Sequence, residues 1–218
     1  MSKDLGPACT LCRREGDKLF LKGERCFSQK CAFERRGYAP GQHGRSGSRG
    51  NRGGGGTGRE SDYARQLRAK QRARRVYGVY ERQFRRYFAN ALRTRGLTGL
   101  VLLQTLESRL DNIIFRLGFA SSRAHARLLV THGHFTVNGR RTDIPSMILE
   151  IGDVVSVRDG SRKVPYFKEL SPIAEAHNVP AWLNRDIKTL SGSIARLPER
   201  VEIEGNLNEQ LIVEYYSR

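Results

Sequence analysis

The segment from Ser108 to Val157 constrains the fold of this chain more than any other part. It begins with apolar residues at helical spacing, which give a first helix one apolar face: Leu110, Ile113, Ile114 and Leu117. Gly118 then ends that helix, because glycine adopts the positive φ of a helix C-cap at little cost. Ser121 or Ser122 can N-cap a second helix, whose apolar residues are Ala124, Leu128 and Leu129.

After Gly133 the pattern changes from helical spacing to alternation. Phe135 and Val137 share one side of a strand, and Asn138-Gly139 is typical of a tight hairpin turn. Further strand residues follow: Ile148, Ile151, Val154, Val155 and Val157. The segment therefore predicts a compact helix–helix–strand unit, with a core formed by Leu110, Ile114, Leu128, Val137 and Val155.

The sequence RLDNIIFRLGFASSRAHARLLVTHGHFTVNGR resembles the small RNA-binding module named after ribosomal small-subunit protein number four. The resemblance implies that residues 107–169 form this module and that cationic side chains off its apolar faces contact RNA. These residues are Arg116, Arg123, Arg127, His134 and Arg140. The same module is appended to pseudouridine synthases, some tyrosyl-tRNA synthetases and stress-related ribosome-binding proteins, so the rest of the chain must identify the host protein.

The chain carries a formal net charge of +17 over 218 residues, which is typical of proteins that bind a polyanion. The charge is concentrated. Residues 35–95 hold 17 Lys and Arg against three acidic residues, whereas residues 170–218 hold five against seven. No run of about 18 apolar residues occurs, and the N-terminus lacks the apolar core of a signal peptide. These features favour a cytoplasmic nucleic-acid binder over a membrane-bound protein.

All four cysteines lie within the first 31 residues, in the arrangement Cys9-x2-Cys12-x13-Cys26-x4-Cys31. Two short pairs flanking a loop suit one structural Zn²⁺ with four thiolate ligands, a closed shell that leaves no position for a catalytic water. Spacing alone leaves an iron–sulfur cluster open as an alternative. Two disulfides would need an oxidising compartment, and a redox Cys-x-x-Cys would not need a second pair.

A basic helix is predicted to begin after Ser61, a favourable N-cap residue. Four arginines follow at spacings of 3, 4 and 3, which places them on one helical face: Arg65, Arg68, Arg72 and Arg75. Because no acidic residue interrupts this stripe, it favours phosphate binding over a merely solvated face. The same prediction extends to Arg35, Arg36, Arg82 and Arg86. A second helix carries an apolar stripe that we assign to the core: Tyr80, Phe84, Tyr87, Phe88 and Ala91.

The glycine-rich stretch PGQHGRSGSRGNRGGGGTGR, residues 40–59, is predicted to be flexible. Its arginines suit phosphate binding, and an ordinary solvated linker is the competing interpretation. In the C-terminal part, Trp182 is predicted to lie in the core. Residues 195–203 are predicted to contain a turn and a short strand, and residues 208–216 a terminal helix.

The motif PGQHG, the basic sequence SDYARQLRAKQRARRVYGVYERQFRRYFANAL, the cysteine array and the module together resemble the family of small-subunit ribosomal protein number four, in its bacterial zinc-bearing form. The lengthened Gly-Arg stretch after His43 departs from the family pattern. The implied fold is α+β and mainly helical, with four regions: a zinc-binding segment with a Gly-rich turn (1–45), a basic helical domain (46–106), the module (107–169) and a tail packed on the helical domain (170–218).

The resemblance implies a structural constituent of the small ribosomal subunit that binds a ribosomal RNA junction and nucleates assembly. It also implies contact with small-subunit ribosomal protein number five, a place where messenger RNA enters, a role in translational accuracy and, for some members, binding to messenger RNA. An RNA-modifying enzyme is disfavoured, because no Gly-rich nucleotide loop or nucleophile–base pair is evident. A zinc-finger regulator is disfavoured, because no recognition helix follows the cysteines. We expect no catalytic residue, small-molecule substrate or membrane partner.

Overall fold

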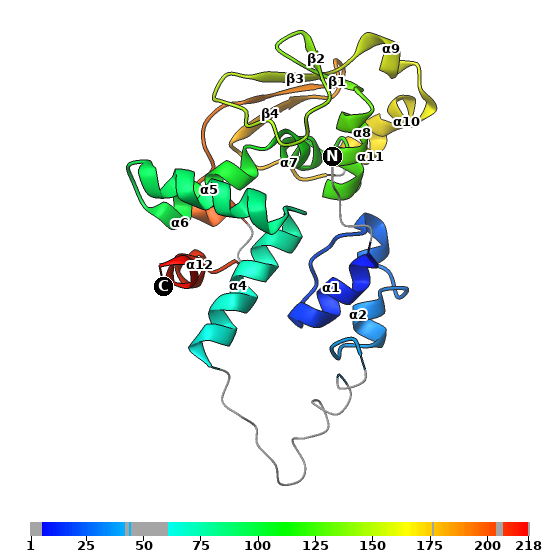
Figure 1. The fold of residues 1–218 in the computed structure, drawn as a ribbon. Helices are drawn as coiled ribbons and strands as arrows, with labels where there is room; N and C mark the ends of the chain where they lie inside the picture. The colour runs from blue at the N-terminus through cyan, green and yellow to red at the C-terminus, as the bar shows by residue number, and fades with distance from the viewer. Residues whose placement is uncertain (1–5, 42–43, 45–60, 176, 204–206, 218) are drawn as a thin grey trace. The chain divides into compact units, whose positions relative to one another are not determined.

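The computed structural model describes residues 6–41, 44, 61–175, 177–203 and 207–217 (Figure 1). The chain forms two compact units: residues 1–90 with 206–218, which we call the helical unit, and residues 91–205, which we call the module unit. The mixed helix and sheet content agrees with the predicted α+β class. Among the described residues, no helix is long and apolar enough to cross a membrane. His43 and residues 45–59 of the glycine-rich stretch lie outside the described residues.

Helices form the helical unit: α1 (Ala8–Glu15), the 3₁₀ helix η1 (Gly23–Cys26), α2 (Ala32–Arg35), α4 (Asp62–Val76), most of α5 (Glu81–Arg93) and α12 (Glu209–Tyr216). Ser61 N-caps α4 as predicted, and its Oγ accepts a hydrogen bond from the Ala64 amide at 3.2 Å. Gly78, which has φ +61°, lies between α4 and α5 and separates the two helices. On α5 the apolar stripe is buried as predicted, except that Tyr80, just before the helix, is 41% exposed.

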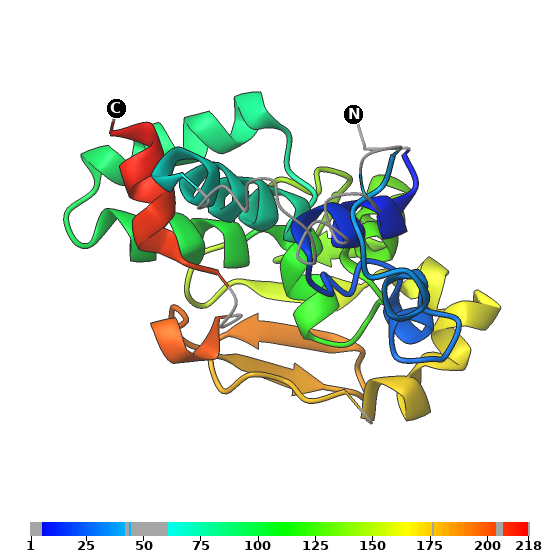
Figure 2. The same cartoon turned by 90° about the horizontal axis from the view of Figure 1, so that it is seen from below.

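The C-terminal helix α12 lies beside α4 (Figures 1 and 2). The Gln66 side-chain amide donates to Glu214 at 2.9 Å, and the ring centroids of Tyr63 and Tyr215 lie 5.8 Å apart. Ile212 of α12 is fully buried. The predicted terminal helix is thus confirmed, and the last residues of the chain complete the core of the helical unit.

The module unit combines helices with one sheet. Its elements are α6 (Thr98–Glu107), α7 (Leu110–Arg116), α8 (Arg123–Thr131), β1 (Phe135–Val137), β2 (Arg140–Thr142), β3 (Val154–Val157), α9 (Asp159–Arg162), α10 (Pro165–Lys168), α11 (Leu170–Glu175), β4 (Leu183–Asp186), β5 (Ser191–Ile194) and the 3₁₀ helix η3 (Arg200–Glu202). The antiparallel sheet has the strand order β2-β1-β3-β5-β4. Asn138 and Gly139 both have positive φ, which confirms the hairpin turn between β1 and β2.

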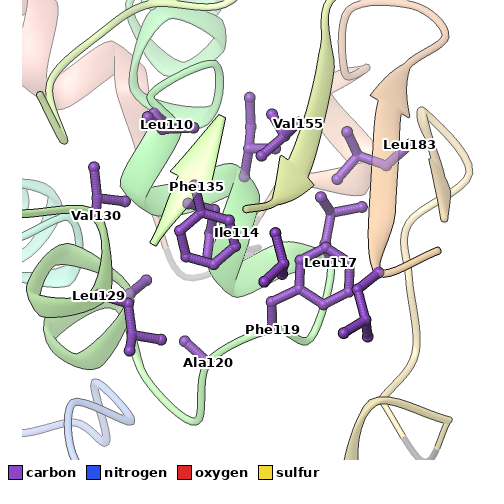
Figure 3. Close-up of a cluster of buried hydrophobic side chains, with 14 of the residues drawn as sticks. Leu110, Ile114, Leu117, Phe119, Ala120, Leu129, Val130, Phe135, Val155 and Leu183 are labelled. Atoms are coloured by element: carbon purple, nitrogen blue, oxygen red, sulfur yellow. The ribbon is translucent and has the colours of Figure 1, made fainter. Parts of the chain in front are cut away.

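The core of the module unit lies between α7, α8 and the sheet (Figure 3). Leu110 and Ile114 of α7 are fully buried together with Phe135 and Val155 of the strands. A Cβ atom at Gly192 of β5 would lie 3.0 Å from the Asn184 carbonyl oxygen, so glycine permits close packing there. The structure therefore confirms the predicted helix–helix–strand unit and adds two strands to it.

The buried face of α8 differs from the prediction. Ala124 is exposed and Leu128 is 41% exposed, whereas Ala126, Leu129 and Val130 are buried. The sequence contains two overlapping apolar periodicities, and packing against α7 selects the one that passes through Leu129. Ile148 and Ile151 are also exposed and lie outside the strands. Of the residues predicted to form strands after the hairpin, only Val154, Val155 and Val157 do so, in β3.

The region from residue 170 onward does not pack as one tail on the helical domain. Strands β4 and β5 extend the sheet beyond β3, so residues 170–203 belong to the module unit, whereas α12 belongs to the helical unit and lies on α4. The open edge of β3 explains this outcome, because its backbone groups need hydrogen-bond partners. Within residues 195–203, η3 replaces the predicted strand. Trp182 is buried as predicted, at 1% exposure.

Candidate nucleic-acid interface

The predicted arginine stripe on α4 mostly faces α1 rather than solvent. The Glu15 side chain has no exposed surface. Its Oε1 atom forms an ion pair with Arg68 Nη1 at 3.2 Å and a second ion pair with Arg75. Arg72 donates to the Glu15 carbonyl oxygen at 3.3 Å and lies 3.6 Å from Asp17. Three of the four arginines predicted to bind phosphate therefore bind acidic residues at the end of α1 or just after it.

Glu15 binds these arginines with a carboxyl group that is buried away from water. Burial raises the pKa of its carboxyl group, and Arg75, Arg68 and Arg72 oppose that rise. A buried carboxylate is stable only when cations and hydrogen bonds replace its lost hydration. The three guanidinium groups are thus required by the internal structure of the helical unit.

The opposite side of α4 is anchored by Glu81. The buried Lys70 Nζ lies 2.9 Å from Glu81 Oε2 and 4.8 Å from the Tyr215 ring centroid. Tyr216 donates its hydroxyl hydrogen to Glu81 at 2.8 Å. Burial raises the pKa of Glu81, but the hydrogen bonds from Lys70 and Tyr216 outweigh this effect and leave the pKa below its ordinary value. This cluster joins α4, α5 and α12.

The arginines of α5 are arranged differently. Arg82, Arg85 and Arg86 line, together with Glu81, an open hollow of about 700 Å³. Arg85 lies 3.7 Å from Glu81, but its side chain remains 71% exposed. Arg82 and Arg86 are exposed as well. The guanidinium groups of α5 can therefore reach an external polyanion without breaking the core.

Three other predicted contacts of the helical unit also reach solvent. Arg65 begins the α4 stripe and pairs with Asp62, and both side chains of this pair are more than half exposed. Arg35 and Arg36 lie at the end of α2 and are both exposed. A surface ion pair such as Arg65–Asp62 contributes little stability, so all three cations can reorient toward phosphate.

In the module unit, a buried glutamate holds two helices and an arginine together. Glu107 Oε1 accepts from Arg116 at 2.7 Å, and Glu107 Oε2 accepts from Asn112 at 2.6 Å. The side-chain oxygen Oδ1 of Asn112 in turn accepts a hydrogen bond from Arg123 Nε at 2.7 Å, and Arg123 Cζ lies 4.7 Å from the centroid of the Phe115 ring. The network fixes the orientations of both predicted RNA contacts.

Asp111 anchors a second arginine pair. Arg109 donates two hydrogen bonds to its carboxylate, at 3.0 and 2.6 Å, and Arg127 Nε lies 3.4 Å from Asp111 Oδ2. Arg109 is buried, whereas Arg127 is partly exposed. Asp111 thus forms a local salt bridge with Arg109 and also holds Arg127, another predicted contact.

The remaining two predicted contacts of the module unit differ from each other. Arg140 is exposed on the edge strand β2. His134 Nδ1 lies 3.0 Å from Ser161 Oγ, and burial, with His132 and Arg158 nearby, lowers its pKa. A neutral imidazole does not form an ion pair with phosphate, so His134 fits a hydrogen-bonding role only.

The anchoring acids Glu15, Glu81 and Glu107 are the functional residues that the sequence did not reveal. Asp111 carried a signal, since it lies next to arginines on a predicted helix. Glu15 carried none, because it precedes its arginine partners by more than fifty residues.

The four cysteines lie in the N-terminal part of the helical unit. Cys12, Cys26 and Cys31 are buried, Cys9 is half-buried, and all four thiols are free. Burial raises the pKa of Cys12, a hydrogen bond with the Leu19 backbone lowers it, and the other three cysteines raise it. Their thiolates would therefore repel one another unless a cation compensates. Among the described residues, however, no group of three or more His, Cys, Asp or Glu side chains is arranged to hold a metal ion. The zinc site stays a prediction.

The sequence of the chain is similar to that of known ribosomal proteins along its whole length. Residues 3–107 match the family described as the ribosomal protein S4/S9 N-terminal domain, and residues 108–155 match the S4 domain. Over 218 residues the chain is 54% identical to the small ribosomal subunit protein uS4A of Symbiobacterium thermophilum, 53% identical to uS4 of Heliobacterium modesticaldum and 50% identical to uS4 of Thermus thermophilus. Each alignment covers 100% of both chains. The chain therefore belongs to the ribosomal protein S4 family.

Proposed function

We propose that this protein is a structural constituent of the small ribosomal subunit, in the cytoplasm, that binds small-subunit ribosomal RNA directly and catalyses no reaction. The observation that carries this proposal is the end-to-end similarity to proteins named as small ribosomal subunit proteins. The S4 domain match over residues 108–155 supports the same function.

The solvent-accessible arginines suit this function. Arg35 and Arg36, Arg82 and Arg86, and Arg140 come from separate parts of the sequence and all reach solvent. A planar guanidinium group binds phosphate through two parallel hydrogen bonds, and folded RNA is recognised mainly by shape and backbone geometry. We infer that the ligand is a folded RNA junction, whose binding nucleates assembly of the subunit.

Further partners follow from the family resemblance. They are small-subunit ribosomal protein number five and messenger RNA, at the opening where messenger RNA enters, where the protein would influence translational accuracy. Neither a membrane nor a small-molecule substrate is part of this proposal. Crosslinking of assembled subunits would test the two partners separately.

Two measurements test the RNA-binding function. The protein should remain with small ribosomal subunits through a high-salt wash. Its affinity for a small-subunit ribosomal RNA transcript should fall linearly with salt on a log–log plot, because phosphate binding releases counterions. A flat salt response, or loss from washed subunits, would contradict the proposal.

We also propose that Cys9, Cys12, Cys26 and Cys31 hold one structural Zn²⁺. Support comes from the four cysteines lying in one short segment with three of them buried, and from the thiolate chemistry that Zn²⁺ prefers. Bound zinc would hold a segment too short to build its own core. Native mass spectrometry should find one zinc, and Cys26→Ser should lower the stoichiometry. Two disulfides or an iron–sulfur absorption band would replace this assignment.

A further inference from the structure

Two phenylalanines form an exposed aromatic pair in the N-terminal segment. The rings of Phe20 and Phe27 stack with centroids 5.0 Å apart and an interplanar angle of 25°. Phe27 is 75% exposed and Phe20 is 42% exposed. Aromatic side chains normally bury most of their surface, so a stacked pair left in water indicates a surface that binds something.

The backbone holds this pair outward at a conformational cost. Phe20 has φ +49°, a left-handed conformation that is unfavourable for a bulky side chain. Its neighbour Leu19 is 4% exposed and anchors the chain in the interior. With the left-handed backbone at Phe20, the Phe20 ring points away from that interior and stacks on Phe27. Such outliers persist where the surrounding structure enforces them, and they are frequent at binding sites.

The charged residues that lie near the pair in the sequence are predominantly cationic. Lys22, Arg25 and Lys30 are exposed in the same segment, with Glu24 as the exposed acid. Ser28 Oγ accepts from the Lys30 amide at 3.3 Å and donates to the Arg25 carbonyl oxygen at 3.1 Å, which orders the loop that carries these cations. An exposed aromatic face with exposed cations a few residues away in the same segment suits a nucleobase with its neighbouring phosphates. An apolar protein surface would not need the cations.

We propose that Phe20 and Phe27 form a stacking site for an unpaired RNA base, while Lys22, Arg25 and Lys30 contact the adjoining phosphates. One face of the Phe27 ring lies against Phe20, and its exposed surface receives the base. The proposal rests on the RNA-binding function above and adds to it a site for single-stranded nucleotides in the N-terminal segment.

The test compares two single strands on the full-length protein: a short oligoadenylate, and the same ribose-phosphate backbone without bases. The wild type should prefer the base-bearing strand, and Phe27→Ala should reduce that preference by about 5- to 150-fold, the range for loss of one base–aromatic stack. Phe27→Leu keeps an apolar side chain but lacks the π-face, so it should behave like the alanine variant. Leu97→Ala is the matched control, because Leu97 is 76% exposed and lies outside this aromatic pair.

A spectroscopic measurement provides the second readout. Phe27→Trp should retain the preference for the base-bearing strand. Oligoadenylate should quench the fluorescence of the added tryptophan, whereas the abasic strand should not. The wild type supplies the background, since Trp182 is buried. An unchanged preference in Phe27→Ala would overturn the proposal. Wild-type behaviour of Phe27→Leu would also overturn it, in favour of an apolar protein contact. Failure of the wild type to bind ribosomal RNA would instead contradict the proposed function itself.

Discussion

Two neighbouring helices of similar composition use their arginines in opposite ways. On α4, Arg68 and Arg75 bind the buried carboxylate of Glu15, whereas on α5, Arg82 and Arg86 line an open hollow. Both sets have helical spacing, so spacing does not explain the difference. The difference lies in the acidic partner, which α1 supplies to α4. An arginine stripe is therefore a phosphate site only where no internal carboxylate has already bound it.

The strongest test of this contrast removes the anchor of the inward-facing arginines. Glu15→Ala should lower the free energy of unfolding by about 3–5 kcal/mol, because it removes a fully buried carboxylate and leaves the partly buried Arg68 and Arg75 without their anion. Urea unfolding measures this change, with Glu24→Ala, an exposed carboxylate of the same segment, as the control. Unchanged stability together with stronger RNA binding would show that the α4 arginines are available to RNA rather than bound within the protein.

A comparison within α4 sharpens the same contrast. Arg68→Ala should lower the free energy of unfolding by about 1.5–3 kcal/mol, since it removes a charged hydrogen bond to a buried group. Arg65→Ala should change it by less than about 0.5 kcal/mol, because its partner Asp62 is exposed. Denaturation curves of the two variants measure the difference. Equal losses would mean that burial does not separate the two ends of the stripe.

On α5 the expected change is in RNA binding rather than in stability. The double variant Arg82→Ala with Arg86→Ala should reduce the slope of log affinity against log salt by about 0.7–0.9 for each phosphate that the protein no longer neutralises. Its unfolding curve should stay close to that of the wild type. Titration of a small-subunit ribosomal RNA transcript at several salt concentrations measures the slope, and an unchanged slope would exclude α5 from the interface.

The smallest effect concerns the pH dependence of the cluster on the other side of α4. Because the folded-state pKa of Glu81 is lowered, its contribution to stability is present above its unfolded pKa and is lost as the pH falls through its folded pKa. Glu81→Gln should therefore be less stable than the wild type at neutral pH, and the gap should close in acid. Thermal unfolding across pH measures this gap, and a gap that widens in acid would contradict the assignment.

The fold was largely predictable because its signals are local. Ser61, Gly78 and the Asn138-Gly139 turn all occupy the positions that capping and turn chemistry require. The prediction was wrong where two apolar patterns fitted the helical period equally well. On α8, Leu129 rather than Leu128 lies on the buried face. It also missed β4 and β5 as partners of β3, because strand pairing depends on contacts between distant segments.

The candidate interface was predictable in composition but not in orientation. Residues 35–95 carry most of the positive charge, and the solvent-accessible Arg35, Arg82 and Arg86 agree with that prediction. In the module unit, Arg116 and Arg127 are instead held by the carboxylates of Glu107 and Asp111. Specific RNA contacts of all these residues remain predictions that variants of the kind described above can test.

By itself the sequence determined where several helices begin or end, the compact unit from Ser108 to Val157, the family and the cationic character of the surface. These properties depend on the identities and spacing of neighbouring residues. Only the tertiary structure decided which arginines reach solvent and which sheet the C-terminal strands join. A guanidinium group binds whichever carboxylate the fold brings close, as Glu15 does for Arg68 and Arg75, and sequence spacing carries no information about a partner that distant.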